Sequence, residues 1–281
     1  MRLVDSHGHV QADDFDADRA AVLDSARTAG VERLLAPGWD LASSEQSLAL
    51  ARTHDWLDAS AGVHPHLAAR VSVDDWRRIG SLAQESRIVA IGETGLDHDR
   101  AFSPREAQLH NLRRHLELAR RTGKPLILHC RSRPGQRDAQ DELIAELRAA
   151  GLGGGDWRAA FVDRPPGVLH SFSGPRDYGL AALELGLAVS FSGLVFRRGQ
   201  EPSAEVARLA PADRLLVETD APYLSVRGAP RRNEPRWVEV TARWLAEERG
   251  EDPEALGAQL VANYERIFRP AGAGSSSTSQ P

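Results

Sequence analysis

The chain has 281 residues, of which 41% are hydrophobic and 27% are charged, and its formal net charge is −5. This composition is typical of a globular protein with a sizeable core, and it excludes the disordered and collagen-like classes. The negative net charge also excludes a nucleic-acid binder with a basic surface over the whole molecule, so any polyanion must be bound locally.

The single cysteine, Cys130, excludes an intramolecular disulfide. No basic and apolar leader precedes Asp5, and no apolar segment approaches the roughly 20 residues that a membrane helix needs. We therefore expect a cytoplasmic protein without membrane contact, and we take a monomer as the default.

Short apolar segments alternate with amphipathic ones along most of the chain. We expect strands at residues 3–9, 31–36, 57–63, 88–91, 126–130, 168–170, 187–192 and 215–220. Helices are expected at residues 18–29, 43–53, 74–86, 104–121, 136–150, 177–185, 203–209 and 235–249. Eight such units predict a parallel sheet that closes into a TIM (β/α)8 barrel, with a doubly wound open sheet as the alternative.

Three further segments complete the prediction. Residues 253–268 form an additional C-terminal helix over an end or flank of a single barrel domain that spans residues 1–270. Residues 151–166 are rich in Gly and Pro and are expected to be an inserted surface loop. Residues 271–281, rich in Gly and Ser, are expected to be a disordered tail.

A histidine pair, His7 and His9, ends the first predicted strand. Side chains alternate along a strand, so both rings point to one face, roughly 7 Å apart at about 3.3 Å of rise per residue. Asp5 could orient one of the rings through its second nitrogen. Taken alone, such a pair is more often a packed strand end than a metal site.

Other predicted strands also end in residues of the metal-ligand type. The C-terminal strand ends of a barrel converge on one mouth, which therefore collects all of them. Four histidines and two carboxylates are too many for one zinc-like ion, but they suit two divalent ions about 3.5 to 4 Å apart. The only lysine, Lys124, precedes the fifth strand at the opposite end, so Glu93 is the expected bridge. The candidate ligands are His7, His9, Glu93, His129, His170 and Asp220.

Six motifs together resemble the TatD-related metal-dependent deoxyribonucleases, a branch of the amidohydrolase barrels. The resemblance covers residues 2–268, and the run from Glu218 to Leu224 followed by Arg232 to Pro235 is its most diagnostic part. The motifs are Asp5-Ser6-His7-Gly8-His9, Gly62-Val63-His64-Pro65, Gly92-Glu93-Thr94-Gly95-Leu96-Asp97, His170-Ser171-Phe172-Ser173-Gly174, Glu218-Thr219-Asp220-Ala221-Pro222-Tyr223-Leu224 and Arg232-Asn233-Glu234-Pro235.

The resemblance implies a division of the ligands between two ions of Mg, Mn or Zn. One ion is held by His7, His9, Glu93 and Asp220, and the other by Glu93, His129 and His170. The implied activity is an exonuclease-type deoxyribonuclease that hydrolyses phosphodiesters with a metal-activated water. Asp220 and Glu93 are the expected catalytic residues, with Asp220 as the general base.

A local basic site is expected to bind the phosphates of DNA or RNA. His64 and His66 follow the third strand at the same mouth, although a turn made rigid by Pro65 explains them equally well. Arg131 is the first choice among the arginines, because a guanidinium can bind phosphate in a bidentate manner. The weaker candidates are Arg133, Arg197, Arg198, Arg231 and Arg232.

The sequence departs from the family pattern where substrate is expected. His98 replaces an aromatic residue, and the segments 132–135 and 151–166 are altered or long. Two alternatives therefore stay open: hydrolysis of another bond by the same centre, such as an aminoacyl ester on RNA or a cyclic amide, and a non-catalytic binding protein. The intact ligand set argues against the second.

Four residues near these motifs are expected to lie outside the ligand set. Asp5 is expected behind the ligands, as an inward carboxylate at the barrel floor. Cys130 is expected to point away from the mouth, between strand and helix. His110 and His115 are expected at the surface, because arginines surround them on their helix.

Overall fold

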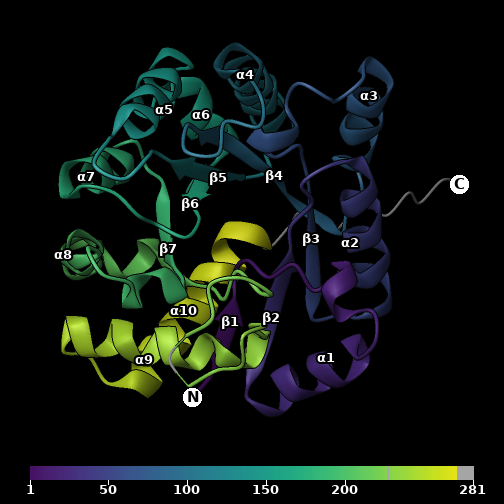
Figure 1. Ribbon diagram of the computed structural model, residues 1–281. Helices are drawn as coiled ribbons and strands as arrows, with labels where there is room; N and C mark the ends of the chain where they lie inside the picture. Colours follow the sequence, from purple (N-terminus) through teal and green to yellow (C-terminus); the bar gives the residue numbers. More distant parts are fainter. Residues whose placement is uncertain (227, 271–281) are drawn as a thin grey trace, which may run out of the picture.

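Eight strands neighbour one another in sequence order, and every adjacent pair is parallel (Figure 1). The structure is a computed structural model that describes residues 1–226 and 228–270, so the tail expected at 271–281 lies outside the described residues. The strands are β1 (Leu3–Asp5), β2 (Val31–Ala36), β3 (Leu57–Ala61), β4 (Ile88–Asp97), β5 (Leu126–Arg131), β6 (Gly167–Leu169), β7 (Ala188–Phe191) and β8 (Leu215–Val217).

Backbone hydrogen bonds between the first and last strands close this sheet. The Ser6 amide donates to the Val217 carbonyl at 3.0 Å, and the Asp220 amide donates to the His7 carbonyl at 2.8 Å. A sheet joined at both edges is a barrel. The predicted TIM barrel is therefore confirmed, and the open-sheet alternative is wrong.

Helices surround the barrel, and most of them begin and end close to the predicted residues (Figure 1). They are α1 (Arg19–Thr28), α2 (Leu41–Thr53), α3 (Val73–Leu82), α4 (Arg105–Thr122), α5 (Asp138–Ala149), α6 (Gly155–Ala160), α7 (Arg176–Glu184), α8 (Glu201–Leu209), α9 (Val238–Arg249) and α10 (Pro253–Phe268). Short 3-10 turns are η1 (Asp13–Phe15), η2 (Pro65–Leu67), η3 (Gly193–Phe196), η4 (Ala212–Arg214) and η5 (Pro235–Trp237). No helix in these described residues is long and apolar enough to cross a membrane.

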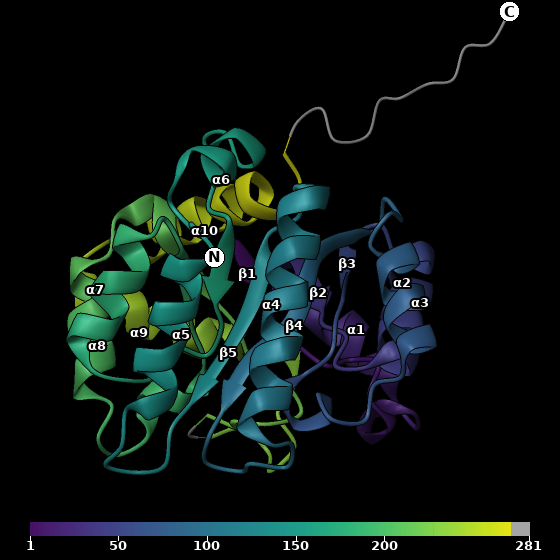
Figure 2. The same ribbon diagram turned by 90° about the horizontal axis from the view of Figure 1, so that it is seen from above.

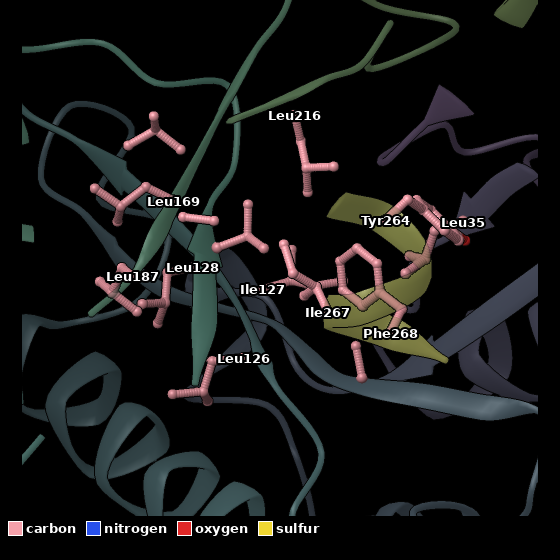
Figure 3. Close-up of a cluster of buried hydrophobic side chains, with 14 of the residues drawn as sticks. Leu35, Leu126, Ile127, Leu128, Leu169, Leu187, Leu216, Tyr264, Ile267 and Phe268 are labelled. Carbon is pink, nitrogen blue, oxygen red and sulfur yellow. The ribbon is translucent and has the colours of Figure 1, made fainter. Parts of the chain in front are cut away.

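The helix α10 lies across one end of the barrel, opposite the loops that follow β4 and β5 (Figure 2). Its residues Tyr264, Ile267 and Phe268 pack against inward side chains of the strands (Figure 3). The Tyr264 hydroxyl donates to Asp58 Oδ2 at 3.0 Å, near the start of β3. Asn263 Nδ2 donates to the Leu215 carbonyl at 2.9 Å, at the start of β8. The predicted additional helix thus fills the floor and leaves the other end for the site.

Two strands differ in length from the prediction. The strand β1 ends at Asp5 rather than at His9, because its later backbone groups bond to separate partners instead of one ladder. The strand β4 continues beyond the predicted end at residue 91, since it pairs with β5 as far as Asp97. Gly95 permits this pairing, because it has a φ of +137° and a side chain there would collide with the His129 carbonyl.

The segment 151–166 is more than the surface loop that its composition predicts. It contains α6, whose Trp157 is buried and stacks on the buried Phe161 with ring centroids 5.6 Å apart. The Trp157 indole also donates to the Ala150 carbonyl at 3.0 Å. These two aromatic residues supply the apolar contacts that fix a short helix in a Gly-rich connection.

Of the two histidines expected at the surface of α4, His110 is exposed but His115 is fully buried. The His115 ring lies on the inward face of the helix, where Nδ1 is 2.7 Å from the Asn111 carbonyl. Its Nε2 accepts a hydrogen bond of 3.0 Å from the Val63 amide. The surface prediction for His115 is wrong because the arginines around it mark only the outer face. Burial lowers the pKa of His115 to about 3.

We expect the contribution of His115 to the free energy of unfolding to fall as the pH drops from about 6 to about 4. The unfolded chain takes up a proton on His115 near its ordinary pKa of 6.5, whereas the folded protein does so only near pH 3. The loss amounts to at most about 1.4 kcal/mol per pH unit. In urea unfolding, a His115→Gln variant should lose less free energy of unfolding over this pH range than the wild type does. A His110→Gln variant should lose as much as the wild type, and equal losses in all three proteins would contradict this explanation.

Candidate metal centre

A cavity of about 790 Å³ opens at the C-terminal ends of the strands. Its wall includes five of the six predicted metal ligands, and the sixth, His7, is fully buried directly behind them. The predicted ligands come from β4, β5 and the segments after β1, β6 and β8. The wall ligands are His9, Glu93, His129, His170 and Asp220.

The predicted ligands lie in two groups that share Glu93. The first group consists of His7, His9 and the carboxylates of Glu93 and Asp220. The two Nε2 atoms lie 3.2 Å apart, and His9 Nε2 is 3.3 Å from Asp220 Oδ1. His7 Nε2 is 3.4 Å from Glu93 Oε2 and 3.7 Å from Asp220 Oδ1. Ligand atoms about 2.0 to 2.1 Å from one tetrahedral ion lie about 3.3 to 3.4 Å from each other. The spacing of these four side chains therefore fits a divalent ion.

The second group meets at the other oxygen of Glu93. Glu93 Oε1 lies 3.1 Å from His129 Nδ1 and 2.9 Å from His170 Nε2, and these two nitrogens are 3.3 Å apart. This spacing also fits a single ion. Although burial by itself raises the pKa of Glu93, the surrounding histidines hold it well below its usual range. Glu93 is therefore a carboxylate that presents one oxygen to each group.

Close packing of glycines sets the position of Glu93. A side chain at Gly62 would come within 2.5 Å of the Gly92 backbone, so these two residues let the end of β3 approach β4. The Glu93 amide donates to the Gly38 carbonyl at 2.7 Å, which ties the same point to the end of β2. The backbone around Glu93 is thus fixed from both sides.

Two carboxylates outside the ligand set orient the histidines of the second group. Asp97 Oδ2 lies 3.2 Å from His129 Nε2, and Glu218 Oε1 lies 3.2 Å from His170 Nδ1. Such partners fix which ring nitrogen carries the proton and leave the other free for a metal. Burial by itself lowers the pKa of His170, but the carboxylates of Glu93 and Glu218 hold that pKa well above its usual value. The sequence prediction missed both partners, although Glu218 stands only two residues before Asp220.

Asp5 does not orient a histidine ring. Its side chain accepts hydrogen bonds from the Thr219 amide at 2.9 Å and the Thr219 hydroxyl at 2.6 Å, and from the His7 amide at 3.3 Å. Nδ1 of His7 and of His9 are buried without a partner among the described residues. Asp5 thus lies behind the ligands, as expected, but at the end of β1 rather than at the floor, which α10 fills. Burial raises the pKa of Asp5 to about 8.

His64 lies much closer to the centre than a residue that contacts only substrate. Its Nε2 is 3.3 Å from Glu93 Oε1, and its ring centroid is 4.6 Å from that of His129. Nδ1 of His64 accepts a hydrogen bond from the His66 amide at 3.1 Å, which leaves the proton of the neutral ring on Nε2. Burial lowers the pKa of His64 to about 4, so the ring is neutral near pH 7. His64 therefore offers an N–H donor rather than a ligand lone pair.

The predicted phosphate-binding residues divide into two sets. His66 and Arg131 line the cavity, where Arg131 Nε lies 3.7 Å from Asp97 Oδ2 and His66 Nε2 lies 2.7 Å from the same oxygen. Arg133 instead lines a neighbouring hollow on the far side of Asp97. Arg232 is outside the cavity wall and pairs with Asp18 and Glu234.

Aromatic residues that the sequence prediction did not single out complete the cavity wall. Trp39 and Tyr223 flank His9, with ring centroids 5.2 and 5.8 Å from its ring. Phe102 lies 4.8 Å from the ring of His66 on another part of the wall. His98, which departs from the family pattern, is turned toward α5, where its Nδ1 lies 2.9 Å from Asp138.

Cys130 forms part of the cavity wall, but its thiol is not suited to nucleophilic attack. Burial raises the pKa of Cys130 to about 12, and its thiol lies beside the Tyr178 hydroxyl of α7. The thiol thus lies between strand and helix as expected, although Cys130 also contributes to the wall of the mouth cavity, from which it was expected to point away.

Comparisons with known proteins point to one family. The model of the TatD related DNases matches residues 4–269. A protein of Cronobacter sakazakii named 3′-5′ ssDNA/RNA exonuclease TatD is 39% identical over 268 residues, which are 92% of this chain and 95% of that protein. An uncharacterized metal-dependent hydrolase of Bacillus subtilis is 30% identical over 95% of this chain and 99% of its own.

Solved structures agree with these relatives. The crystal structure of a TatD homologue from Escherichia coli, YjjV, has a TM-score of 0.81 and 28% identity, and the match covers 95% of this chain and 98% of that chain. A TatD family hydrolase from Entamoeba histolytica has a TM-score of 0.82 at 20% identity, with 96% and 99% coverage, and supports the fold alone.

The carboxylate behind His170 offers a test of the centre that does not depend on catalysis. We expect Glu218→Gln to weaken the binding of a divalent ion about 10- to 100-fold, because a neutral amide no longer supports the ring. Isothermal titration calorimetry with Mn²⁺ or Zn²⁺ measures the change. Asp58→Asn is the matched control, since Asp58 is an equally buried carboxylate at the floor of the barrel. Equal affinities in the wild type and Glu218→Gln would show that Glu218 does not support the centre.

Proposed function

This chain belongs to the family of TatD-related DNases, and we propose on that basis that it is a metal-dependent exonuclease acting on the 3′ end of single-stranded DNA or RNA. The observation that carries the proposal is the position of Glu93 between two groups of ligands at the barrel mouth. The relatives named as exonucleases match nearly their whole length, so the activity is proposed for the complete barrel, residues 1–270.

We infer that the two groups hold two divalent ions of Mg, Mn or Zn. His7, His9 and Asp220 would hold one together with Glu93 Oε2, and His129 and His170 would hold the other together with Glu93 Oε1. When bound, such a pair promotes the deprotonation of a water and offsets the charge that develops on the reacting phosphate.

Asp220 is our candidate for the general base. Its side chain is 15% exposed and belongs to the cavity wall, so it can reach a water there. Although burial raises the pKa of Asp220, the hydrogen bond from His9 and the charges of His7 and His9 hold it below its usual value. The ionised carboxylate can therefore accept a proton near pH 7.

Two further residues, His64 and Arg131, would bind and orient the phosphate. His64 lines the cavity with its Nε2 3.3 Å from Glu93 Oε1, where the N–H could donate to a phosphate oxygen. Arg131 offers the forked guanidinium that matches two phosphate oxygens, and Asp97 steadies both Arg131 and His66 from behind.

The alternative substrates draw no specific support from the comparisons. A 5-methylcytosine deaminase from Klebsiella pneumoniae and a dihydroorotase from Campylobacter jejuni match with TM-scores of 0.61 and 0.58, but each is only 12% identical and shares the fold alone. Hydrolysis of an aminoacyl ester or a cyclic amide is therefore left as an outcome of the assay. The cytoplasmic location and the monomeric state stay predictions.

We expect metal-loaded protein to shorten a 5′-labelled single-stranded DNA from its 3′ end, and a chelator to abolish this activity. Asp220→Asn should lower kcat at least about 100-fold, because it removes both a ligand and the proton acceptor. Electrophoresis of the labelled products measures both effects. Asp156→Asn, a change in an exposed carboxylate of α6, should retain the wild-type rate. Equal DNA loss in the wild type, Asp220→Asn and chelated samples would reveal a contaminating nuclease and refute the proposal.

The assignment of Arg131 over Arg232 predicts a difference in salt dependence. Each phosphate contact on a single strand contributes about 0.7 to the slope of log Kd against log salt concentration. Arg131→Ala should therefore reduce the slope by about 0.7, whereas Arg232→Ala should leave it unchanged because Arg232 pairs with Asp18. Fluorescence anisotropy with a labelled oligonucleotide measures the slopes. An unchanged slope in Arg131→Ala would contradict the assignment.

A further inference from the structure

We propose that two separate aromatic surfaces in the cavity hold the two nucleosides on either side of the phosphate that is cleaved. The 3′-terminal nucleoside would lie beside Trp39 and Tyr223, and the preceding nucleoside would lie beside Phe102. This inference rests on the proposed function and adds to it the direction in which a single strand enters the site.

The first aromatic surface adjoins the group that contains His9. Trp39 and Tyr223 both meet the His9 ring edge to face, at interplanar angles of 69° and 70°. Tyr223 is 57% exposed although it belongs to the cavity wall, so much of its ring is open to a ligand. Leu194 and Leu224 extend the same wall with apolar side chains.

The second aromatic surface adjoins the other group. Phe102 is 61% exposed, and its ring meets that of His66 edge to face at 4.8 Å. The His66 ring lies 4.2 Å from His64 and 6.2 Å from His129. An exposed aromatic side chain thus stands next to His9 of one ligand group, and another is separated from His129 of the other group by the His66 ring. The exposure of an apolar aromatic ring to water is unfavourable, whereas a nucleobase can stack on either ring and cover it.

The geometry of a phosphodiester matches this arrangement. A phosphate bound at the ligand groups carries one nucleoside on each of its two sides, and each nucleoside then reaches a different aromatic surface. Stacking on an aromatic ring accepts every base, because every base has a flat π face. The surfaces therefore suit an enzyme that shortens single strands without regard to sequence.

The distribution of charge assigns the two sides. Among the described residues of the cavity wall, the arginines are Arg100 and Arg131. Arg100 stands two residues before Phe102, and Arg131 shares the Asp97 carboxylate with His66, whose ring meets that of Phe102. Asp99 is the carboxylate beside them on the wall. The body of a strand carries further phosphates, whereas a terminal nucleoside carries none beyond the one cleaved. The body therefore belongs on the side of Phe102, which leaves Tyr223 for the terminal nucleoside.

Oligonucleotides that lack one base test this assignment. Three single-stranded DNAs of equal length are needed: an unmodified strand, a strand with an abasic 3′-terminal residue, and a strand with an abasic residue one position before the end. The kcat and KM of the first cleavage are measured for the wild type, Tyr223→Ala and Phe102→Ala. Both side chains are largely exposed, so their truncation leaves the core intact. Tyr223→Phe and Phe102→Tyr, which keep the ring, serve as matched controls.

We expect the wild type to lose about 5- to 150-fold in kcat/KM for each abasic strand. Tyr223→Ala should no longer distinguish the strand with the abasic terminal residue from the unmodified strand, but should still discriminate at the preceding position. Phe102→Ala should show the converse, and the two controls should retain the wild-type dependence on both bases.

Two results would overturn the inference while leaving the proposed function intact. One is cleavage by the wild type with no dependence on either base. The other is a Phe102→Ala variant that no longer distinguishes the strand with the abasic terminal residue from the unmodified strand. A wild type that fails to cleave the unmodified strand with Mg²⁺, Mn²⁺ or Zn²⁺ would instead overturn the proposed function itself.

Discussion

The carboxylate of Glu93 is the constraint on which the rest of the site depends. Its two oxygens face different sets of nitrogens, at 3.4 Å from His7 and at 2.9 Å from His170. A buried carboxylate is costly unless cations or donors surround it, and the histidines around Glu93 supply this environment. The same arrangement places the two ligand groups side by side. In the function proposed above, one phosphate would be held between these groups, within reach of Asp220 on the cavity wall.

The barrel makes this arrangement possible by bringing distant segments together. Glu93 is near the middle of β4, while the other ligands follow or end strands from β1 to β8. The helix α10 fills the opposite end, so the apolar core and the polar mouth are kept apart along the barrel axis (Figures 2 and 3). The close approach at Gly62 and Gly92 then brings the backbone of β4 to the position that the carboxylate needs.

Much of this could be predicted from the sequence, because the relevant signals are local. Apolar periodicity locates the strands, and ligand-type residues at their ends indicate the mouth of a barrel. The parts that were missed depend on contacts across the fold. Glu218 supports His170 from 48 positions away, and His115 is buried because of the direction in which one helix face points. Phe102 belongs to no motif, and the motif that contains Tyr223 gives this residue no role, so only the exposure of the two rings on the cavity wall marks them.

The central claim is that Glu93 bridges two ions, and anomalous diffraction from crystals grown with Mn²⁺ tests it most directly. The account predicts two anomalous peaks about 3.5 to 4 Å apart. One should lie against Glu93 Oε2, His7, His9 and Asp220, and the other against Glu93 Oε1, His129 and His170. A single peak, or a pair of peaks that Glu93 does not contact, would contradict the account.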